Sequence, residues 1–261
     1  MDLAHGAAFY PTASVRAAAL EELNAADAIV IAAGRNSTAT QSRLDLLREN
    51  AGLARELGQA FRDYRGVVVM VTNPVDVLTH VFRKASGLPP ERVIGTGTML
   101  DTARLRQRLG GELDLDPRSI HAQVVGEHGD SEVVVWSSAQ VGGTPLREWR
   151  GWSPEHEERL TKEVRTAAYE IIRRKGATNH AIGLVTASLL QSILRDERRV
   201  LTVSRVQGAT AGVGEVAISL PAVVGADGAA LVIQPQLDSA ERSALERSAS
   251  ILAQAIAAAD R

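Results

Sequence analysis

The sequence predicts an α/β protein in which helices cover a parallel β-sheet. The clearest sign is the run Val-Val-Val-Met-Val-Thr at residues 67–72, because a nearly continuous β-branched segment is typical of a strand buried on both faces. A second apolar run, residues 26–33, ends at Gly34 and also reads as a buried strand. Apolar residues at helical spacing follow from Leu44 onward, so strand, loop and helix occur in the order expected of an α/β protein.

The composition is that of an ordinary globular protein. The 261 residues are 45% hydrophobic and 23% charged, which suits one large domain or two moderate ones. The net charge of −2 gives no broad electrostatic reason to expect a nucleic acid or membrane partner. No apolar run reaches the roughly 18 residues of a membrane span, and no signal peptide is evident, so the cytoplasm is the default compartment. With no cysteine, disulfides, thiolate metal ligands and a cysteine nucleophile are excluded.

Two polar segments follow the first two predicted strands. Residues 35–43 contain no large apolar side chain and separate a strand from a helix, which is where α/β proteins place lids. Asn73 follows the strand at 67–72, and Pro74 marks the first turn of the next helix. Asn73 therefore lies at the carboxyl end of a parallel strand, where open α/β sheets bind ligands. Its alternative role is a helix cap.

A third predicted strand, residues 93–98, ends in a glycine-rich turn and leads into a helix. Gly95-Thr96-Gly97 is not a dinucleotide fingerprint, because the third glycine and its spacing are absent. Asp101 and Arg104 stand three residues apart in the helix, so both lie on one helical face. They form either part of a site or a surface ion pair.

A histidine lies in a tight polar loop between two further predicted strands, 120–125 and 133–136. The loop reads Gly126-Glu127-His128-Gly129-Asp130, and its glycines allow the backbone to turn. A histidine on such a support can exchange a proton near neutral pH. The alternative is a turn with a surface histidine.

The rest of the chain supplies scaffold. We expect a turn at 142–145, helices at 154–175, 178–194 and 239–259, and strands at 200–206 and 216–220, the last followed by Pro221.

Taken together, these segments resemble the L-lactate/malate dehydrogenase family, and the lactate-type branch most closely. The resemblance covers essentially the whole chain. It rests on three motifs that occur in the family's order: Thr72-Asn73-Pro74-Val75-Asp76, Gly97-Thr98-Met99-Leu100-Asp101-Thr102-Ala103-Arg104 and Gly126-Glu127-His128-Gly129-Asp130. A fourth, weaker match lies at residues 219–222.

The resemblance implies an incomplete Rossmann-type parallel-sheet domain followed by an α+β substrate-binding and catalytic domain. The first would span residues 1–99 and the second residues 100–261. It also implies an NAD-dependent L-2-hydroxy-acid dehydrogenase, most simply one that interconverts L-lactate and pyruvate. The expected partners are a small 2-oxo or 2-hydroxy acid and further copies of the chain in a dimer or tetramer.

The resemblance also assigns roles to residues. His128 is the implied acid/base, Asp101 orients its ring, and Arg43 stabilises charge on the substrate carbonyl oxygen. Arg104 would bind the substrate carboxylate through two hydrogen bonds. Asn73 would hold the carbonyl oxygen or the nicotinamide side. Thr178 and Ser37 would line the substrate pocket. The residues implied to face NAD are Gly34, Arg35, Val71, Asn73 and Thr96. No metal site is expected.

A further match concerns regulation. Arg106 and His121 occupy positions through which many bacterial lactate dehydrogenases bind fructose 1,6-bisphosphate between subunits. Two subunits on a symmetry axis would supply the clustered positive charge that a sugar bisphosphate needs. The alternative is that both are ordinary surface residues.

The sequence departs from the family in two places. The Gly-x-Gly-x-x-Gly turn and its βαβ unit are not found, so a shortened chain of this kind should bind NAD poorly or not at all. A truncated, inactive family member is therefore an alternative. In the lid, Ser37 stands where lactate-type members usually carry glutamine and malate-type members arginine. Serine offers no charge to a second carboxylate, which argues against malate and leaves room for a larger, branched 2-hydroxy acid.

Overall fold

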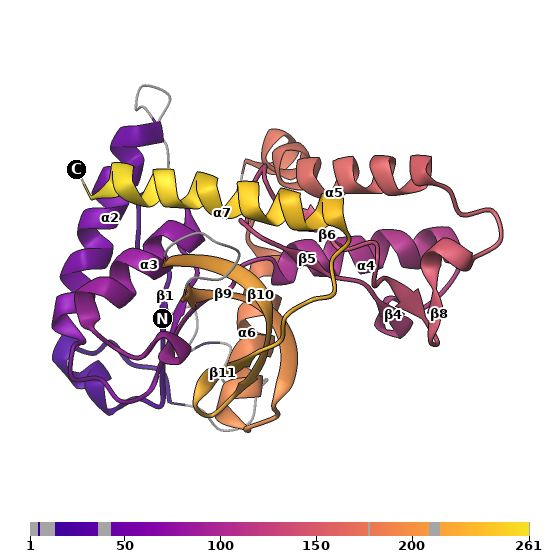
Figure 1. Cartoon of the computed structure of the whole chain (residues 1–261). Helices are drawn as coiled ribbons and strands as arrows, with labels where there is room; N and C mark the ends of the chain where they lie inside the picture. The colour runs from indigo at the N-terminus through magenta and orange to yellow at the C-terminus, as the bar shows by residue number, and fades with distance from the viewer. Residues whose placement is uncertain (1–4, 6–13, 36–42, 177, 209–214, 261) are drawn as a thin grey trace.

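A six-stranded sheet forms the larger part of the molecule, and two helices with short strands form a smaller part beside it (Figure 1). In this computed structural model, residue 5 and residues 14–35, 43–176, 178–208 and 215–260 are described. The strand order in the large sheet is β1-β2-β3-β9-β10-β11. The first three strands run parallel and the last three antiparallel, and β3 meets β9 at the single pair Gly95–Ser204. The predicted α/β fold is confirmed.

The elements follow the chain in this order. The strands of the large sheet are β1 (Ala28–Ile31), β2 (Val67–Met70), β3 (Val93–Gly95), β9 (Arg199–Gln207), β10 (Val216–Gly225) and β11 (Gly228–Val232). The short strands are β4 (Ile120–His121), β5 (Val124–Val125), β6 (Val133–Val134), β7 (Gln140–Val141) and β8 (Thr144–Pro145). The helices are α2 (Arg43–Ala60), α3 (Val75–Ser86), α4 (Met99–Leu113), α5 (Pro154–Lys175), α6 (His180–Leu194) and α7 (Ser239–Ala259). Short 3₁₀ helices lie at Leu20–Ala25, Pro90–Arg92, Pro117–Ser119 and Leu146–Glu148.

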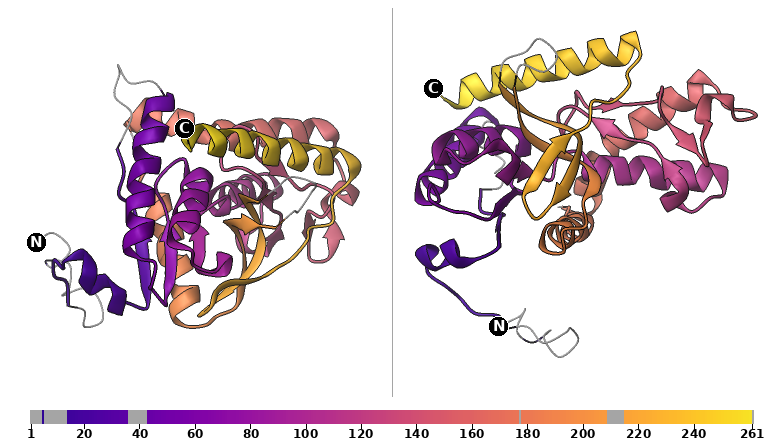
Figure 2. Two further views of the ribbon diagram at one scale, coloured as in Figure 1. Left: turned by 60° about the vertical axis from the view of Figure 1, so that its left-hand side comes forward. Right: turned by 60° about the horizontal axis from the view of Figure 1, so that its bottom comes forward.

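Both faces of the large sheet are covered by helices. Alternate residues of β2 point to opposite faces, and all four are buried, as the β-branched run predicts. Val68 and Met70 pack in the core formed with α2, α3 and α7. Val67 and Val69 pack on the other side with Leu189 and Ile193 of α6. The two views of Figure 2 show α7 lying across the larger part and extending towards the smaller one.

The smaller part has its own core between α4, α5 and the short strands. Leu105 and Leu109 of α4 pack against Leu160 and Val164 of α5. Ile120, Val124 and Trp136 close this core from the strand side. Because Asp101 and Arg104 lie on α4 just before these core residues, the core fixes the helix that carries them.

Several predicted elements differ from the structure: the strands predicted at 26–33, 67–72, 93–98 and 133–136 are shorter, and the turn predicted at 142–145 includes β8. The strand predicted at 120–125 is divided into β4 and β5, which belong to different sheets. β10 continues through Pro221 to Gly225, and β11 follows it, whereas the sequence suggested an end near residue 220. The helix predicted from residue 178 begins at His180. The predicted division at residues 99 and 100 stays a prediction; β9, β10 and β11, from the second segment, complete the sheet that β1, β2 and β3 begin.

Within the described ranges, none of the helices has the length and apolar character that a membrane span requires. The same residues contain no group of three or more His, Asp or Glu side chains placed to hold a metal ion.

Candidate active site

The site lies at the carboxyl ends of the parallel strands, beside the amino end of α4. Asn73 follows β2 and is exposed, so its amide is accessible to a ligand. Its Oδ1 also accepts a hydrogen bond from the Val75 N–H at 3.3 Å, but the cap residue of α3 is Pro74, so Asn73 precedes the helix cap. Thr96 follows β3 and is 3% exposed. The parallel arrangement therefore brings these two polar residues to one edge of the sheet.

Asn50 on α2 connects two parts of this edge, and sequence reasoning missed it. Its Oδ1 accepts from the Arg35 N–H at 2.8 Å. Its Nδ2 donates to the carbonyl oxygens of Arg35 (3.2 Å) and Asn73 (3.3 Å). Gly34 lies in the same loop, and a Cβ there would come within 2.3 Å of Thr72 Cγ2, so only glycine permits this close approach. The only sequence signal was a polar residue on the buried side of a helix.

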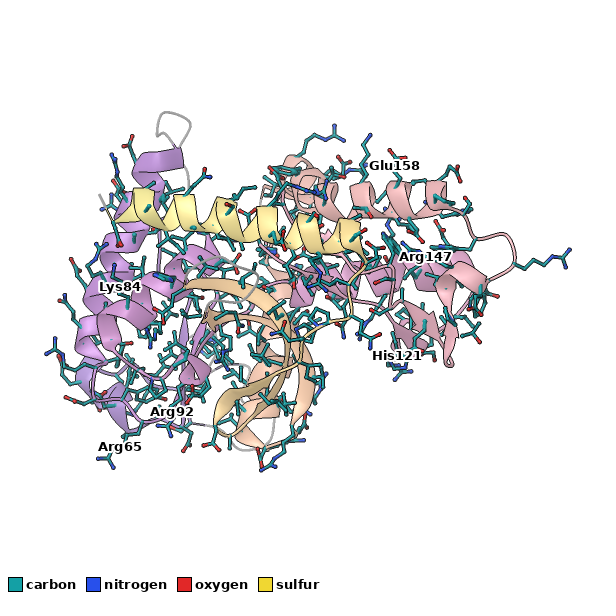
Figure 3. The ribbon with its side chains drawn as sticks, viewed as in Figure 1. Arg65, Lys84, Arg92, His121, Arg147 and Glu158 are labelled. Carbon is teal, nitrogen blue, oxygen red and sulfur yellow. The ribbon has the colours of Figure 1, made fainter. Side chains whose placement is uncertain are left out.

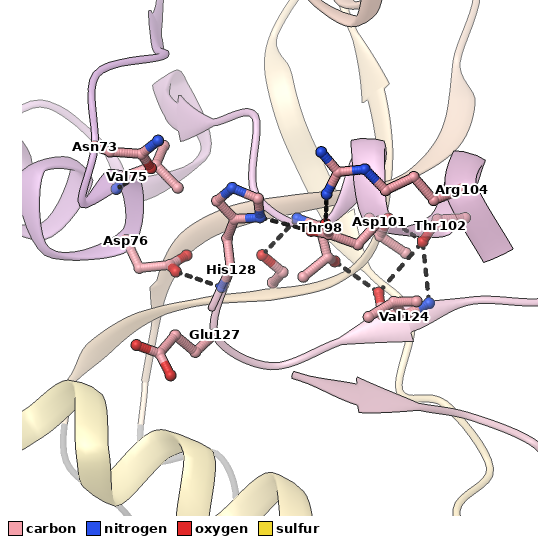
Figure 4. A network of polar contacts seen from close by, with 12 residues as sticks. Asn73, Val75, Asp76, Thr98, Asp101, Thr102, Arg104, Val124, Glu127 and His128 are labelled. Carbon is pink, nitrogen blue, oxygen red and sulfur yellow. Dashed lines mark hydrogen bonds and ion pairs between the residues drawn. The ribbon is translucent and has the colours of Figure 1, made fainter. Parts of the chain in front are cut away.

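Asp101 is the centre of the charged part of the site. One oxygen, Oδ2, lies 2.6 Å from His128 Nδ1, and the other, Oδ1, accepts from Arg104 at 2.6 Å (Figure 4). The Asp101 side chain is 3% exposed and that of Arg104 15%, so they are not a surface ion pair. A buried carboxylate shared by two cationic partners fixes the positions of both side chains.

The loop that carries His128 is held by three elements. Gly126 exchanges main-chain hydrogen bonds with Ser219 of β10. The Glu127 N–H donates to Ser248 Oγ of α7 at 2.8 Å. The His128 N–H donates to Asp76 Oδ2 of α3 at 2.8 Å. Because these partners come from distant parts of the chain, the histidine is not on a simple surface turn, and its side chain is only 24% exposed.

The surroundings of His128 favour its charged form. Burial of the ring lowers its pKa, but the hydrogen bond and charge of Asp101, helped by the charge of Asp76, outweigh burial. The result raises the pKa of His128 to about 9. With Nδ1 occupied by Asp101, Nε2 is the ring atom left to exchange a proton with a ligand. The arrangement can therefore donate a proton next to Arg104, a group that binds carboxylates.

Two more buried carboxyl groups lie near His128. Burial raises the pKa of Asp76 to about 6, against the lowering effect of Ser204 and of the His128 N–H and ring. Burial, together with the Asp101 charge, raises the pKa of Glu132 to about 8. Asp76 appears in a motif that the sequence singled out, but neither residue was assigned a role.

Other predicted site residues lie apart from this group or outside the described residues. Ser37 lies outside them, and Arg43 begins α2 without a described side chain. Thr178 is exposed just before α6, and the described contacts do not join it to the network around His128. Its role stays a prediction.

The two residues of the expected effector site lie close together on the smaller part. Arg106 of α4 donates from Nε to the carbonyl oxygen of Ala122 at 2.9 Å, and burial lowers its pKa. His121, the neighbour of Ala122, is exposed on β4 and projects outward in Figure 3. The Arg106 guanidinium therefore lies against the main chain next to His121.

Comparison with known proteins identifies the family. The model of the NAD-binding domain of lactate/malate dehydrogenases matches residues 1–95, and that of the alpha/beta C-terminal domain matches residues 98–261. The chain belongs to the lactate/malate dehydrogenase family. This confirms the resemblance drawn from the three motifs.

Relatives and solved structures agree with this membership in the lactate/malate dehydrogenase family. An L-lactate dehydrogenase of Synechococcus sp. (strain JA-3-3Ab) is 44% identical over 98% of this chain and 85% of its own length. One of Thermus aquaticus is 45% identical over 96% of this chain and 83% of its own. The crystal structure of the minor L-lactate dehydrogenase of Enterococcus mundtii in the ligands-bound form has a TM-score of 0.94 at 36% identity, covering 98% of this chain and 84% of that one.

Proposed function

We propose that this site interconverts L-lactate and pyruvate, with NAD as the hydride acceptor and NADH as the donor. The chain is an NAD-dependent L-lactate dehydrogenase-like oxidoreductase, as its family and its relatives at 44% and 45% identity indicate. The observation that carries the assignment of roles is the Asp101 carboxylate, bonded to His128 on one oxygen and to Arg104 on the other. Asp101 thereby holds a proton donor, His128, next to a carboxylate-binding group, Arg104.

NAD is the cofactor, and the residues at the sheet edge fit its nicotinamide end. Asn50 fixes the main chain at Gly34 and Arg35, and glycine at position 34 allows this main chain to pack against Thr72, so the backbone at this sheet edge is held in place for a bound ring. Asn73 supplies an exposed amide, and Thr96 and Val71 border the same edge. When bound, the nicotinamide accepts or supplies the hydride. No described residue is assigned to the pyrophosphate.

His128 performs the proton transfer in this proposal. In pyruvate reduction, protonated Nε2 donates its proton to the carbonyl oxygen as the C2–H bond forms. In lactate oxidation, neutral Nε2 removes the hydroxyl proton. Asp101 keeps the ring oriented and stabilises the imidazolium.

Arg104 and Arg43 handle the negative charges of the substrate. Arg104 is mostly buried and binds the C1 carboxylate, where its planar guanidinium allows two parallel hydrogen bonds. Arg43, at the start of α2, closes over the carbonyl oxygen and stabilises the charge that develops there. Asn73 assists at the same oxygen, and Thr178 and Ser37 border the substrate's side chain.

The choice of 2-oxo acid rests on Ser37. A pocket without a second positive charge favours pyruvate over oxaloacetate, and the small serine admits branched side chains. Relative kcat/KM values for pyruvate, oxaloacetate and 2-oxoisocaproate test this order. A preference for oxaloacetate would instead assign malate as the substrate.

An oligomer with a regulatory site completes the proposal. Exposed apolar side chains on α5 and α6, such as Ile172 and Leu184, support association with further copies in a dimer or tetramer. The pair Arg106 and His121 would bind fructose 1,6-bisphosphate between two copies. Sedimentation velocity with and without the bisphosphate tests both points. We also propose a cytoplasmic location, where NAD-linked enzymes meet small 2-oxo acids.

The decisive experiment joins a binding assay to a rate assay. Fluorescence titration of the chain with NADH should show binding, and pyruvate should then be reduced. Arg104→Lys should raise KM for pyruvate at least about tenfold, because lysine loses one of the two hydrogen bonds. Arg108→Lys, on the exposed side of α4, is the matched control. A folded chain that binds no NADH at millimolar concentration would support the alternative of an inactive family member.

A further inference from the structure

Asp76 is a buried charged residue directly beneath the loop that carries His128. It lies in the first turn of α3 and is 2% exposed. Its Oδ2 accepts the His128 N–H at 2.8 Å (Figure 4). Its Oδ1 is buried and has no hydrogen-bond partner among the described residues. The buried carboxylate therefore has one hydrogen bond among the described residues, and its donor is the main-chain N–H of His128, the proposed acid/base.

The location of Asp76 at a helix start does not explain its charge. An acidic residue in the first helical turn is favourable by roughly 0.3–1 kcal/mol. Burying a carboxylate with an unpartnered oxygen costs more than that. A neutral side chain with one acceptor oxygen would serve the His128 N–H at a lower cost.

The groups around Asp76 define what its charge can act on. His128 and Glu127 face it from the catalytic loop, and Ser204 faces it from β9. Ser204 Oγ influences the carboxyl without reaching hydrogen-bond geometry, so both of these buried atoms lack a partner in the described structure. Of these groups, the His128 ring is the cation, and the Asp76 charge raises its pKa in addition to the effect of Asp101.

We propose that Asp76 is a positioning residue for the reaction, which holds the His128 main chain in place and supplies a second negative charge that keeps the imidazole protonated. The proposal rests on the function proposed above. Asp101 holds the ring of His128 at Nδ1, and Asp76 holds the backbone of His128 at its N–H. Both carboxylates favour the charged form of the same ring.

The test uses Asp76→Asn, which removes the charge and keeps the shape. Asn Oδ1 can accept the His128 N–H, and its Nδ2 can donate to the otherwise unpartnered Ser204 Oγ. Glu241→Gln is the matched control. Glu241, in the first turn of α7, is also a buried carboxylate that accepts a loop N–H, that of Ser137, but it does not contact His128.

The primary readout does not need turnover. The His128 ring is titrated by NMR in the chain alone, its signal identified by its loss in His128→Gln. We expect the midpoint to fall by about one pH unit in Asp76→Asn. It should stay unchanged in Glu241→Gln. A midpoint unchanged in Asp76→Asn overturns the proposal.

The pH profile of pyruvate reduction is the second readout. Its alkaline limb should move to lower pH by the same amount, because less of the enzyme carries protonated His128. The melting temperature of Asp76→Asn at pH 8 should not fall, since an unfavourable buried charge has been removed. A lower melting temperature with an unshifted titration would make Asp76 a structural residue. If Asp76→Asn fails to fold, Asp76→Ser, which keeps one acceptor, is judged by the same titration.

This design separates the two proposals. If the wild-type chain reduces no 2-oxo acid, the proposed function fails, while the NMR titration still decides whether Asp76 acts on His128. If the chain is active and the titration does not move, the inference on Asp76 fails alone.

Discussion

Gly126 and Ser219 donate main-chain hydrogen bonds to each other, with N–O distances of 2.9 and 3.0 Å, and so join the histidine loop to the central antiparallel strand β10. Ser219 also accepts the Thr98 N–H through its hydroxyl at 3.2 Å. Thr98 precedes α4, which carries Asp101. One serine therefore sets the histidine loop and the aspartate helix at a fixed distance from each other.

We predict that Gly126→Ala weakens both stability and activity. Gly126 has a φ of +93°, and a Cβ there would lie 2.9 Å from Ser248 Oγ, which holds the loop. The strained backbone should cost about 1–3 kcal/mol in the free energy of unfolding, measured by urea denaturation. Gly142→Ala is the control, since it also has a positive φ but meets nothing within 4 Å. Equal losses of activity in both variants would contradict the argument.

We predict that Asp101→Asn lowers kcat/KM for pyruvate by about 100-fold or more, because the partner that orients and charges His128 is lost. The effect should grow with pH, since the His128 pKa falls in the variant. Steady-state kinetics between pH 6 and about 9 measure it. Asp116→Asn, at an exposed aspartate–arginine pair with Arg118, should leave the rates unchanged.

We predict that the stability of the chain falls between pH 6.5 and about 9 through His128. Its pKa is raised in the folded state, so folding favours the proton-bound form, and the stabilisation is complete below 6.5 and lost as pH rises through about 9. Urea denaturation at several pH values should show this slope reduced in His128→Gln. A parallel pH dependence in both proteins would show that His128 is not the group responsible.

We predict that Glu132→Gln makes the folded protein less sensitive to alkaline pH. Burial and the Asp101 charge raise the pKa of Glu132 to about 8, so its contribution to stability is present at low pH and lost as pH rises from 4.5 through about 8. Glutamine has no such titration. The melting temperature of the variant should exceed that of the wild type above pH 8, and the reverse order would place the ionised carboxylate in a stabilising contact. Glu112→Gln, at an ion pair with Arg159, is the control.

Sequence patterns predicted the main features of the fold well, because strands and helices that are buried carry apolar residues at characteristic spacings. The β-branched run at 67–72 gave β2, and the position of Asn73 at its carboxyl end followed. The spacing of Asp101 and Arg104 placed both on one face of α4, and the structure joins them. Their roles in catalysis stay predictions.

The features that sequence reasoning missed depend on contacts between distant segments. The strand predicted at 120–125 is interrupted at residues 122 and 123. There the Ala122 carbonyl accepts from Arg106 of α4 instead of from a strand, and the chain passes from the sheet of β7 to that of β6. Pro221 suggested the end of a strand, yet Pro221 pairs with Thr202 of β9, and the Pro221 carbonyl accepts the Ile233 N–H at 2.8 Å, so β10 continues through it. Asn50 and Asp76 gain significance only from groups brought to them by the fold.

The hydrogen bond from the Glu127 N–H to Ser248 Oγ connects the histidine loop to α7, more than 100 residues further along the chain. During synthesis the loop leaves the ribosome long before residues 239–259, so it waits without this support until α7 has emerged and docked. Up to that moment His128 lacks one of its three anchors. The proposed site is therefore complete only after α7 has been synthesised, and a nascent chain arrested before α7 would contain Asp101, Arg104 and His128 without this anchor of the histidine loop.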